Sequence, residues 1–276
     1  MPQQRIRQYP VQPALGRHQV LDPRSLAYRR PWTTETIRAI EWAPKVHVLD
    51  QQDLRAQGIY TSQLAPGVED VDGLGSCTAN AATCAISVLH TADRLQDAGL
   101  DTTSTVRAEE WAIGLYADAT RHDEWLDYQW PSDDCGSSGL GVAKALHTRG
   151  LIDSYAPATS AEELCRDLQT GPVLMGVPWH DAWFEPRGRE ALLDDIPAWE
   201  TSPIAGGHEV CVLALETVRW AGERRLDYAH TVIRCRNSWS ASWGDGGDFR
   251  LSLAVYQRLR DQIDLVQPRL DSRSHA

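Results

Sequence analysis

The hydrophobic period of this chain changes near residue 170, and this change constrains the fold more than any other feature of the sequence. Before it, apolar residues recur at helical spacing in two long stretches, 78–90 and 107–121. After it come continuous apolar runs typical of buried strands, at 172–177, 208–215, 231–236 and 248–253. Helices followed by mostly antiparallel strands indicate an α+β fold with two subdomains. A cleft between two such subdomains is the expected place for a functional site.

Local signals predict several shorter elements. Helices are expected over 140–149, where Gly150 provides the stop, and over 160–168, which opens on a capping signature. A short helix over 33–43 and a strand over 46–49 are also predicted. These assignments place most helices before residue 170.

The first 35 residues are rich in Arg, Gln and Pro and show no period. They are expected to form an extended arm on the surface or a partly disordered leader. We divide the chain into an N-terminal extension over 1–60, a helical subdomain over 61–170 and a β-rich subdomain over 171–276.

Composition excludes several classes of protein. The 276 residues suffice for one large or two small domains, and the formal net charge of −11 argues against a nucleic-acid surface, which needs basic patches. No apolar run is long enough to span a bilayer, and the start of the chain lacks the apolar core of a secretory signal. The six cysteines contain no C-x-x-C pair, so free thiols are expected. We therefore expect a cytoplasmic protein without nucleic-acid or membrane partners.

Cys77 stands where a glycine-rich stretch runs into a helix. Gly73 and Gly75 lead into it, and Ser76 is suited to cap the helix through its side-chain oxygen. The unpaired N–H groups and the dipole of a first helical turn favour a thiolate and lower the pKa of a cysteine. A lone cysteine is also commonly a small buried hydrophobe, so the position alone leaves both interpretations open.

A nucleophilic cysteine needs a base and a group that orients the base. His208 follows two glycines and begins an apolar strand, which would hold its ring rigidly. Asn237 lies where another strand enters a turn rich in glycine and tryptophan, and its amide oxygen could accept the second ring N–H of His208. A half-buried structural histidine and a turn-capping asparagine are the alternatives.

Together these residues resemble the papain-like cysteine peptidases, in a form that looks bacterial. The resemblance rests on three motifs: Gly75, Ser76 and Cys77; Gly207 and His208; and Asn237, Ser238 and Trp239, which a Trp-Gly-Asp-Gly-Gly sequence follows. The order Cys, His, Asn fits this family, and about 130 positions separate the first two. The segment around Cys135 and Gly136, which precedes a helix, also resembles the bacterial branch.

The resemblance implies a papain-like fold, in which a helical subdomain packs against an antiparallel, β-barrel-like subdomain with the active-site cleft between them. Cys77 and His208 would form a thiolate–imidazolium pair, Asn237 would orient the ring, and Trp239 would shield that hydrogen bond. The substrate would be a peptide or protein, with no metal or organic cofactor and with scope for a regulatory partner protein. The residues expected to line the substrate cleft are Val71, Gly75, Ser76, Cys135, Gly136, Gly207 and Trp239. Trp179, His180 and Trp183 either lie near its far end or fill the core.

The chain departs from the family pattern at several positions. Val71 stands where the family has a glutamine that donates to the oxyanion, and losing such a donor costs about 10²–10³ in rate. Carboxylates near Val71 would oppose thiolate formation if they point inward. Glu209 replaces a small residue, although strand alternation should turn it away from the face of His208. Leu74 removes a cysteine of the family's usual disulfide, and residues 1–60 show no obvious inhibitory pro-region.

Three functions remain open. The chain is a cysteine-dependent hydrolase, most simply a peptidase, in which another donor replaces the glutamine missing at Val71. Alternatively, the fold serves amide formation or acyl transfer, or it is an inactive relative that binds peptides or a partner protein. The intact set of Cys77, His208 and Asn237 argues against inactivity.

Overall fold

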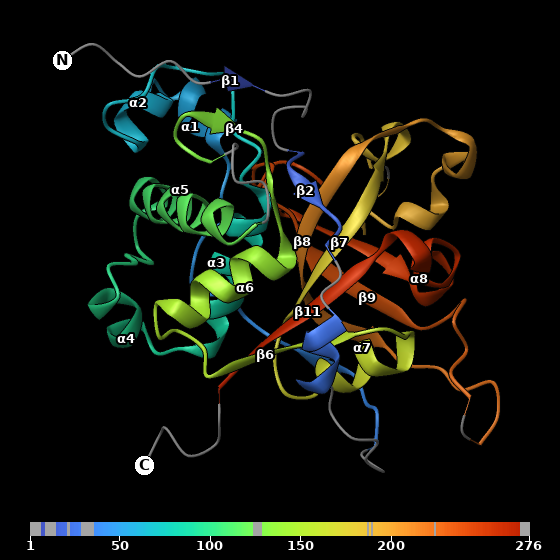
Figure 1. The fold of residues 1–276 in the computed structure, drawn as a ribbon. Coiled ribbons are helices and arrows are strands. Elements are labelled where there is room, and N and C mark those ends of the chain that lie inside the picture. Colours follow the sequence, from blue (N-terminus) through green and yellow to red (C-terminus); the bar gives the residue numbers. More distant parts are fainter. Residues whose placement is uncertain are drawn as a thin grey trace.

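The computed structural model describes residues 7–8, 15–20, 23–28, 36–123, 129–186, 188, 190–223 and 225–270. The α-helices are α1 (Gln51–Ala56), α2 (Thr61–Leu64), α3 (Cys77–Leu89), α4 (Ala92–Asp97), α5 (Thr105–His122), α6 (Gly139–Thr148), α7 (Ala161–Asp167) and α8 (Leu253–Leu259). Short 3₁₀ helices are η1 (Pro23–Tyr28), η2 (Asp181–Trp183), η3 (Leu193–Asp195), η4 (Trp199–Thr201) and η5 (Arg260–Gln262). Helices α3 to α6 lie together on one side of the sheet (Figure 1).

A seven-stranded antiparallel sheet forms the other half of the molecule. Its order is β10 (Asp248–Ser252), β9 (Val232–Arg236), β8 (Ile204–Thr217), β7 (Val173–His180), β11 (Asp264–Arg269) and β6 (Ser154–Ala158), and β3 (Ile40–Glu41) pairs with the end of β8. The fold is therefore papain-like, as predicted, with an open sheet in the described residues where a barrel-like subdomain was expected. Two further pairs are parallel and short: β1 (Arg7–Gln8) with β4 (Asp133–Asp134), and β2 (Arg17–His18) with β5 (Ser137–Ser138).

The sheet separates two hydrophobic clusters, and alternation along its strands explains how. In β8, Cys211 and Leu213 face the cluster built around the helices, while Val210 and Val212 face the second cluster. Successive side chains of a strand point to opposite faces, so one apolar run supplies both cores. This double burial fixes β8 in the centre of the sheet, where it carries His208.

Two of the predicted elements are wrong. In the described part of 33–43 there is no helix, and Ile40 and Glu41 form β3 because they pair with β8. Residues 46–49 are not a strand: Val46 and Leu49 are buried in the helical cluster, where they fill the core without pairing to a neighbouring strand. The other predicted helices and strands are confirmed within one to a few residues.

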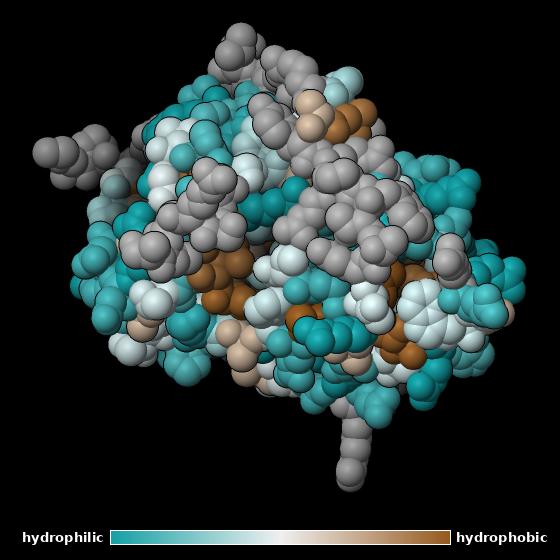
Figure 2. Space-filling model, turned by 90° about the horizontal axis from the view of Figure 1, so that it is seen from below, coloured by the Kyte–Doolittle hydropathy of each residue, from teal (hydrophilic) through white to brown (hydrophobic). Residues whose placement is uncertain are grey.

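On the face seen from below, hydrophilic residues dominate and apolar ones form separate small patches between them (Figure 2). The large apolar side chains that are exposed lie far apart in the sequence: Leu26, Tyr60, Ile204 and Trp220. None of the helices that the structure describes is both long and apolar enough to cross a membrane.

Candidate active site

Helix α3 begins at Cys77 and points its first turn at the sheet. Ser76 occupies the N-cap position, as predicted, but its side chain makes no capping hydrogen bond. Its hydroxyl instead donates to Asn80 Oδ1 at 3.3 Å and accepts from Gln51 Nε2 at 2.9 Å. The side chain of Gln51 also accepts from the backbone N–H of Leu74. Gln51 thus holds the loop before Cys77, and it binds the Ser76 hydroxyl that would otherwise cap the helix.

His208 and Asn237 are brought together by adjacent strands. His208 Nε2 and Asn237 Oδ1 lie 2.7 Å apart, and both side chains are buried. Asn237 Oδ1 also accepts from the N–H of Ser238, and its own N–H donates to the carbonyl of Gly247. Gly247 has a φ of +89°, which favours glycine, so the glycine-rich turn is needed to return the chain onto Asn237. The asparagine is thereby fixed with its oxygen towards the imidazole.

Tryptophan rings enclose this pair. Trp239 stacks on the His208 imidazole with ring centroids 4.6 Å apart, and Trp179 meets it edge-on at 5.0 Å. Trp179 and Trp183 are fully buried members of the second core cluster, while Trp183 also contacts the ring of His180. These tryptophans therefore fill the core, as one of the two interpretations had it, and Trp179 additionally limits movement of the imidazole.

The place where the substrate cleft was expected is occupied by the chain itself. The N–H of Gly16 donates to Cys77 Sγ at 3.4 Å, and its carbonyl accepts from the N–H of Ser137 at 2.7 Å. His18 Nε2 lies 2.6 Å from the carbonyl oxygen of Cys135. We call residues 15–18 the cleft segment. Because Leu15, Gly16 and Arg17 are buried, the expectation of a surface arm is wrong for these residues.

Three glycines make room for the cleft segment. A side chain on Gly136 would collide with the backbone of Gly16, and one on Gly207 would collide with the backbone of Arg17. A methyl group on Gly75 would lie only 3.1 Å from the Cα of Gly16. Gly75 lies in the loop before α3, Gly136 directly precedes β5, and Gly207 lies in β8. The segment therefore touches both halves of the molecule at the place where the sequence predicted a substrate cleft, and β2 lies at their junction (Figure 1).

Cys77 meets the sheet beside His208. Its sulfur is within reach of the backbone N–H of Glu209, the next residue in β8, as well as that of Gly16. Only 2% of Cys77 is exposed, and burial raises the pKa of its thiol to about 12 despite these N–H groups. The helix start was expected to lower this pKa, and that expectation is wrong because the cleft segment keeps water from the sulfur. All six cysteines are free and buried.

The position of Val71 lies apart from the sulfur. Its side chain packs against the helical cluster, and its carbonyl accepts from Arg55 Nη1 and Thr61 Oγ1. A cavity of about 20 Å³ adjoins Cys77 instead, enough for one water-sized atom group, and Gln51, Gln52 and Ser238 are among its lining residues. Gln51 and Gln52, at the start of α1, are candidates that motif matching missed, because they lie about 20 residues before the expected position in the sequence.

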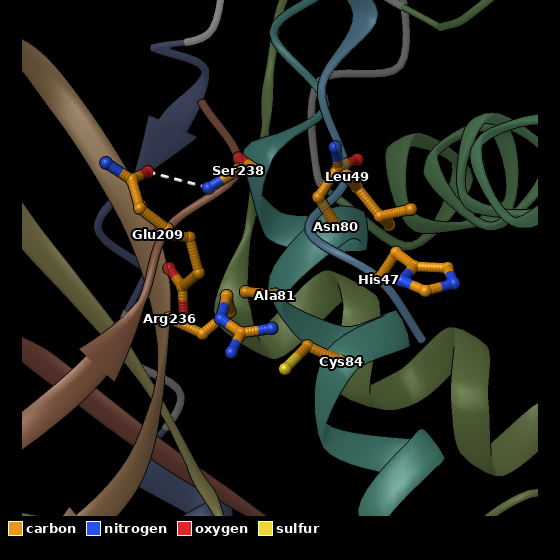
Figure 3. A pocket seen from close by; sticks show the side chains of 9 residues that line it. His47, Leu49, Asn80, Ala81, Cys84, Glu209, Arg236 and Ser238 are labelled. Carbon is orange, nitrogen blue, oxygen red and sulfur yellow. Dashed lines mark hydrogen bonds between the residues drawn. The ribbon is translucent and has the colours of Figure 1, made fainter. Parts of the chain in front are cut away.

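A second small cavity separates α3 from the sheet. Figure 3 shows Asn80, Ala81 and Cys84 of α3 on one side and Glu209 and Arg236 on the other. Its volume is about 10 Å³, so it accommodates no more than about one water. The two halves are therefore in close contact along α3.

The charges around the site come from other residues than expected. The carboxylates of Asp70 and Asp72 are exposed and do not point inward. Buried carboxyl groups replace them: burial raises the pKa of Glu109 to about 7, of Asp134 to about 6 and of Glu209 to about 8. Asp134 accepts from the N–H of Gly75, which braces the loop before Cys77. Within the described ranges, no three His, Cys, Asp or Glu side chains gather in a way that could hold a metal ion.

Comparison with solved structures supports this fold through xylellain. Xylellain, a cysteine protease from Xylella fastidiosa, superimposes with a TM-score of 0.59 at 15% identity, covering 95% of this chain and 97% of its own. Procathepsin L 3 of Tenebrio molitor matches with a TM-score of 0.49 at 13% identity, over 93% of this chain and 76% of its own. A Carica candamarcensis cysteine protease gives a TM-score of 0.42 at 15% identity, over 84% and 98%. No protein-family model matches this chain, and no curated protein matches it.

Proposed function

We propose that this chain is a cysteine peptidase that acts through Cys77, His208 and Asn237. The observation that carries the proposal is the 2.7 Å contact between His208 Nε2 and Asn237 Oδ1 beside the strand backbone that Cys77 Sγ approaches. A structural histidine does not need an orienting amide, a stacked tryptophan and a neighbouring thiol at once. The likeness in fold to xylellain, a cysteine protease, supports the same function.

The chemistry follows from the roles of these groups. With the cleft segment displaced, His208 takes the proton of Cys77, and the thiolate attacks the carbonyl carbon of a substrate amide. His208 then protonates the leaving amine, and a water releases the acyl group from the sulfur. Asn237 keeps the imidazole directed at the sulfur through its bond to Nε2. Trp239 covers that bond from one side of the ring.

The oxyanion requires donors near the sulfur, and Val71 offers none. One donor is the backbone N–H of Cys77, which lies in the first turn of α3, where no intrahelical acceptor exists. The second is the side-chain amide of Gln52, which lines the cavity beside Cys77. Gln51 is less suited, because its Nε2 already donates to Ser76 and Glu109. The cavity has room for the single oxygen that this role demands.

Fluorogenic peptides test the proposal in the full chain and in a Gly16→Ala variant, whose new methyl group would collide with Gly75 and disturb the cleft segment. Hydrolysis should disappear in Cys77→Ala and persist in Cys165→Ala, a buried cysteine of the second core cluster. A covalent adduct at Cys77 with an epoxide inhibitor should accompany activity. A folded Gly16→Ala protein that hydrolyses no peptide and forms no adduct would disprove the assignment.

A further inference from the structure

Three neighbouring strands place one carboxyl group on each side of a glycine. Asp264 of β11 pairs with Gly176 of β7, and Gly176 pairs with Glu209 of β8. Directly paired residues of an antiparallel sheet present their side chains on the same face. Asp264 and Glu209 therefore flank a gap in which Gly176 contributes no side chain.

A fourth position confirms that the two carboxyl groups face one space. A methyl group built on Gly139, at the start of α6, would lie 2.9 Å from Glu209 Oε1 and 3.3 Å from Asp264 Oδ2. Glycine at 139 and at 176 thus leaves a pocket open between the helix start and the sheet. This pocket adjoins the place where Cys77 meets β8.

The guanidinium of Arg17 fills this pocket. It forms an ion pair with Asp264, and both side chains are only 5% exposed. Its atoms lie against Gly176, and its Cδ would lie 3.2 Å from a methyl group on Gly207. A side chain on Gly176 would block the guanidinium, and one on Gly207 would block the backbone of Arg17. The pocket therefore fits an arginine in shape as well as in charge.

Two carboxyl groups of the pocket face the single guanidinium of Arg17. Glu209 is buried, and neither of its carboxyl oxygens has a hydrogen-bond partner among the described residues. Arg17 lowers the pKa of Glu209, but burial outweighs it and holds that pKa at about 8. Without Arg17, Asp264 would lose its ion pair and Glu209 the cation that lowers its pKa. A buried acid pair of this kind needs a cationic occupant or must take up protons.

We propose that this pocket, formed by Asp264, Glu209, Gly139, Gly176 and Gly207, selects substrates with an arginine side chain next to the residue that contacts Cys77. The inference rests on the proposed peptidase function, which it extends to a substrate class. Arg17 shows the fit because it directly follows Gly16, whose N–H meets the sulfur. Arginine should be preferred over lysine, since its planar guanidinium presents its N–H donors in a fixed fork, which suits pairing with a carboxylate.

The first experiment ranks peptides with the Gly16→Ala protein, which retains Arg17. Arginine is moved through each position of a fluorogenic peptide and replaced there by citrulline, which has the same shape without the charge, or by norleucine. At one position arginine should raise kcat/KM at least about tenfold over citrulline. Asp264→Asn should remove most of this difference between the arginine and citrulline peptides.

The second experiment needs no catalysis. In the full-length Arg17→Ala protein, propylguanidinium should raise the melting temperature and propylurea should not, because only the cation replaces the lost side chain. The effect should vanish in Arg17→Ala/Asp264→Asn. If Arg17→Ala fails to fold, Arg17→Gln keeps the volume and removes the charge for the same measurement.

The outcomes separate this inference from the function on which it rests. Peptide hydrolysis with arginine and citrulline ranked equally at every position would overturn the pocket and leave the peptidase intact. Stabilisation by propylguanidinium without hydrolysis of any peptide would support the pocket and refute the peptidase. Absence of both the ranking and the stabilisation overturns the pocket.

Discussion

Substituting Gly16 by alanine should expose Cys77 to reagents. The new methyl group would fall within the backbone of Gly75, which cannot rotate away as a flexible side chain would. The N–H of Gly16 then leaves Cys77 Sγ, and water reaches the sulfur. We expect faster alkylation of Cys77 in this variant than in the unchanged chain.

The magnitude follows from the ionisation of the thiol. With the cleft segment in place, the pKa of Cys77 is about 12 because the sulfur is buried. At pH 7 such a thiol is ionised about once in 10⁵, whereas an ordinary cysteine with a pKa near 8.5 is ionised to about 3%. Only the thiolate reacts with iodoacetamide, so the alkylation rate should rise by about 3 × 10³. Pairing with His208 would raise it further.

Mass spectrometry of peptides after timed alkylation at pH 7 measures this rate for each cysteine separately. Cys165 and Cys235 are buried away from the cleft and serve as internal standards. Gly222→Ala is the matched control, since a methyl group there meets nothing within 4 Å. If folded Gly16→Ala protein is alkylated at Cys77 no faster than the control, the cleft segment does not govern access to the sulfur and the reasoning fails.

Three further substitutions test individual groups. Burial raises the pKa of Glu209 from 4.5 to about 8, so its contribution to stability is complete below pH 4.5 and is lost as pH rises towards 8. The loss is at most about 5 kcal/mol. In urea unfolding at pH 5 and pH 8, Glu209→Gln should reduce this loss of stability with pH, and an unchanged loss would count against the assignment. Asn237→Ala should lower kcat on the order of 10² with little change in KM, because the base loses its orientation; a change confined to KM would contradict that role. Gln52→Ala should lower kcat by about 10²–10³, because the oxyanion loses a donor. Val71→Gln should not raise kcat, since Val71 packs into the helical cluster. The reverse result for both variants would show that the oxyanion donor belongs at position 71.

Periodicity predicted the elements that bury an apolar face along their whole length. Helix α5 and strands β7 to β10 are of this kind, and their own residues determine what they become. Strand β11 was not predicted, because Asp264, Gln267 and Pro268 interrupt its apolar pattern. Its polar residues have specific partners: Asp264 meets Arg17, and Gln267 Nε2 donates to the carbonyl of Asp167. A strand held by such distant partners carries no local signal of its own.

The candidate site divides in the same way. Cys77, His208 and Asn237 could be named from the sequence because each stands at a recognisable junction between an apolar run and a glycine-containing turn. The cleft segment could not, because its place depends on the shape of a groove rather than on its own period. Gly75, Gly136 and Gly207 are separated widely in the chain, and only the folded molecule shows that they accommodate one backbone.

The orientation of the cleft segment explains how a peptide can lie against Cys77 without being an evident substrate. Cys77 Sγ lies at the N–H edge of the peptide group that joins Leu15 and Gly16. A thiolate attacks a carbonyl carbon from above the plane of the peptide group, not along the N–H edge. The carbonyl of Gly16 is held by Ser137 and is therefore directed at the cleft wall. A substrate must turn the face of a carbonyl group to the sulfur. The cleft segment and a substrate can both place an arginine between Asp264 and Glu209, and they differ in how their backbones meet Cys77. This difference in backbone orientation separates the bound cleft segment from a substrate.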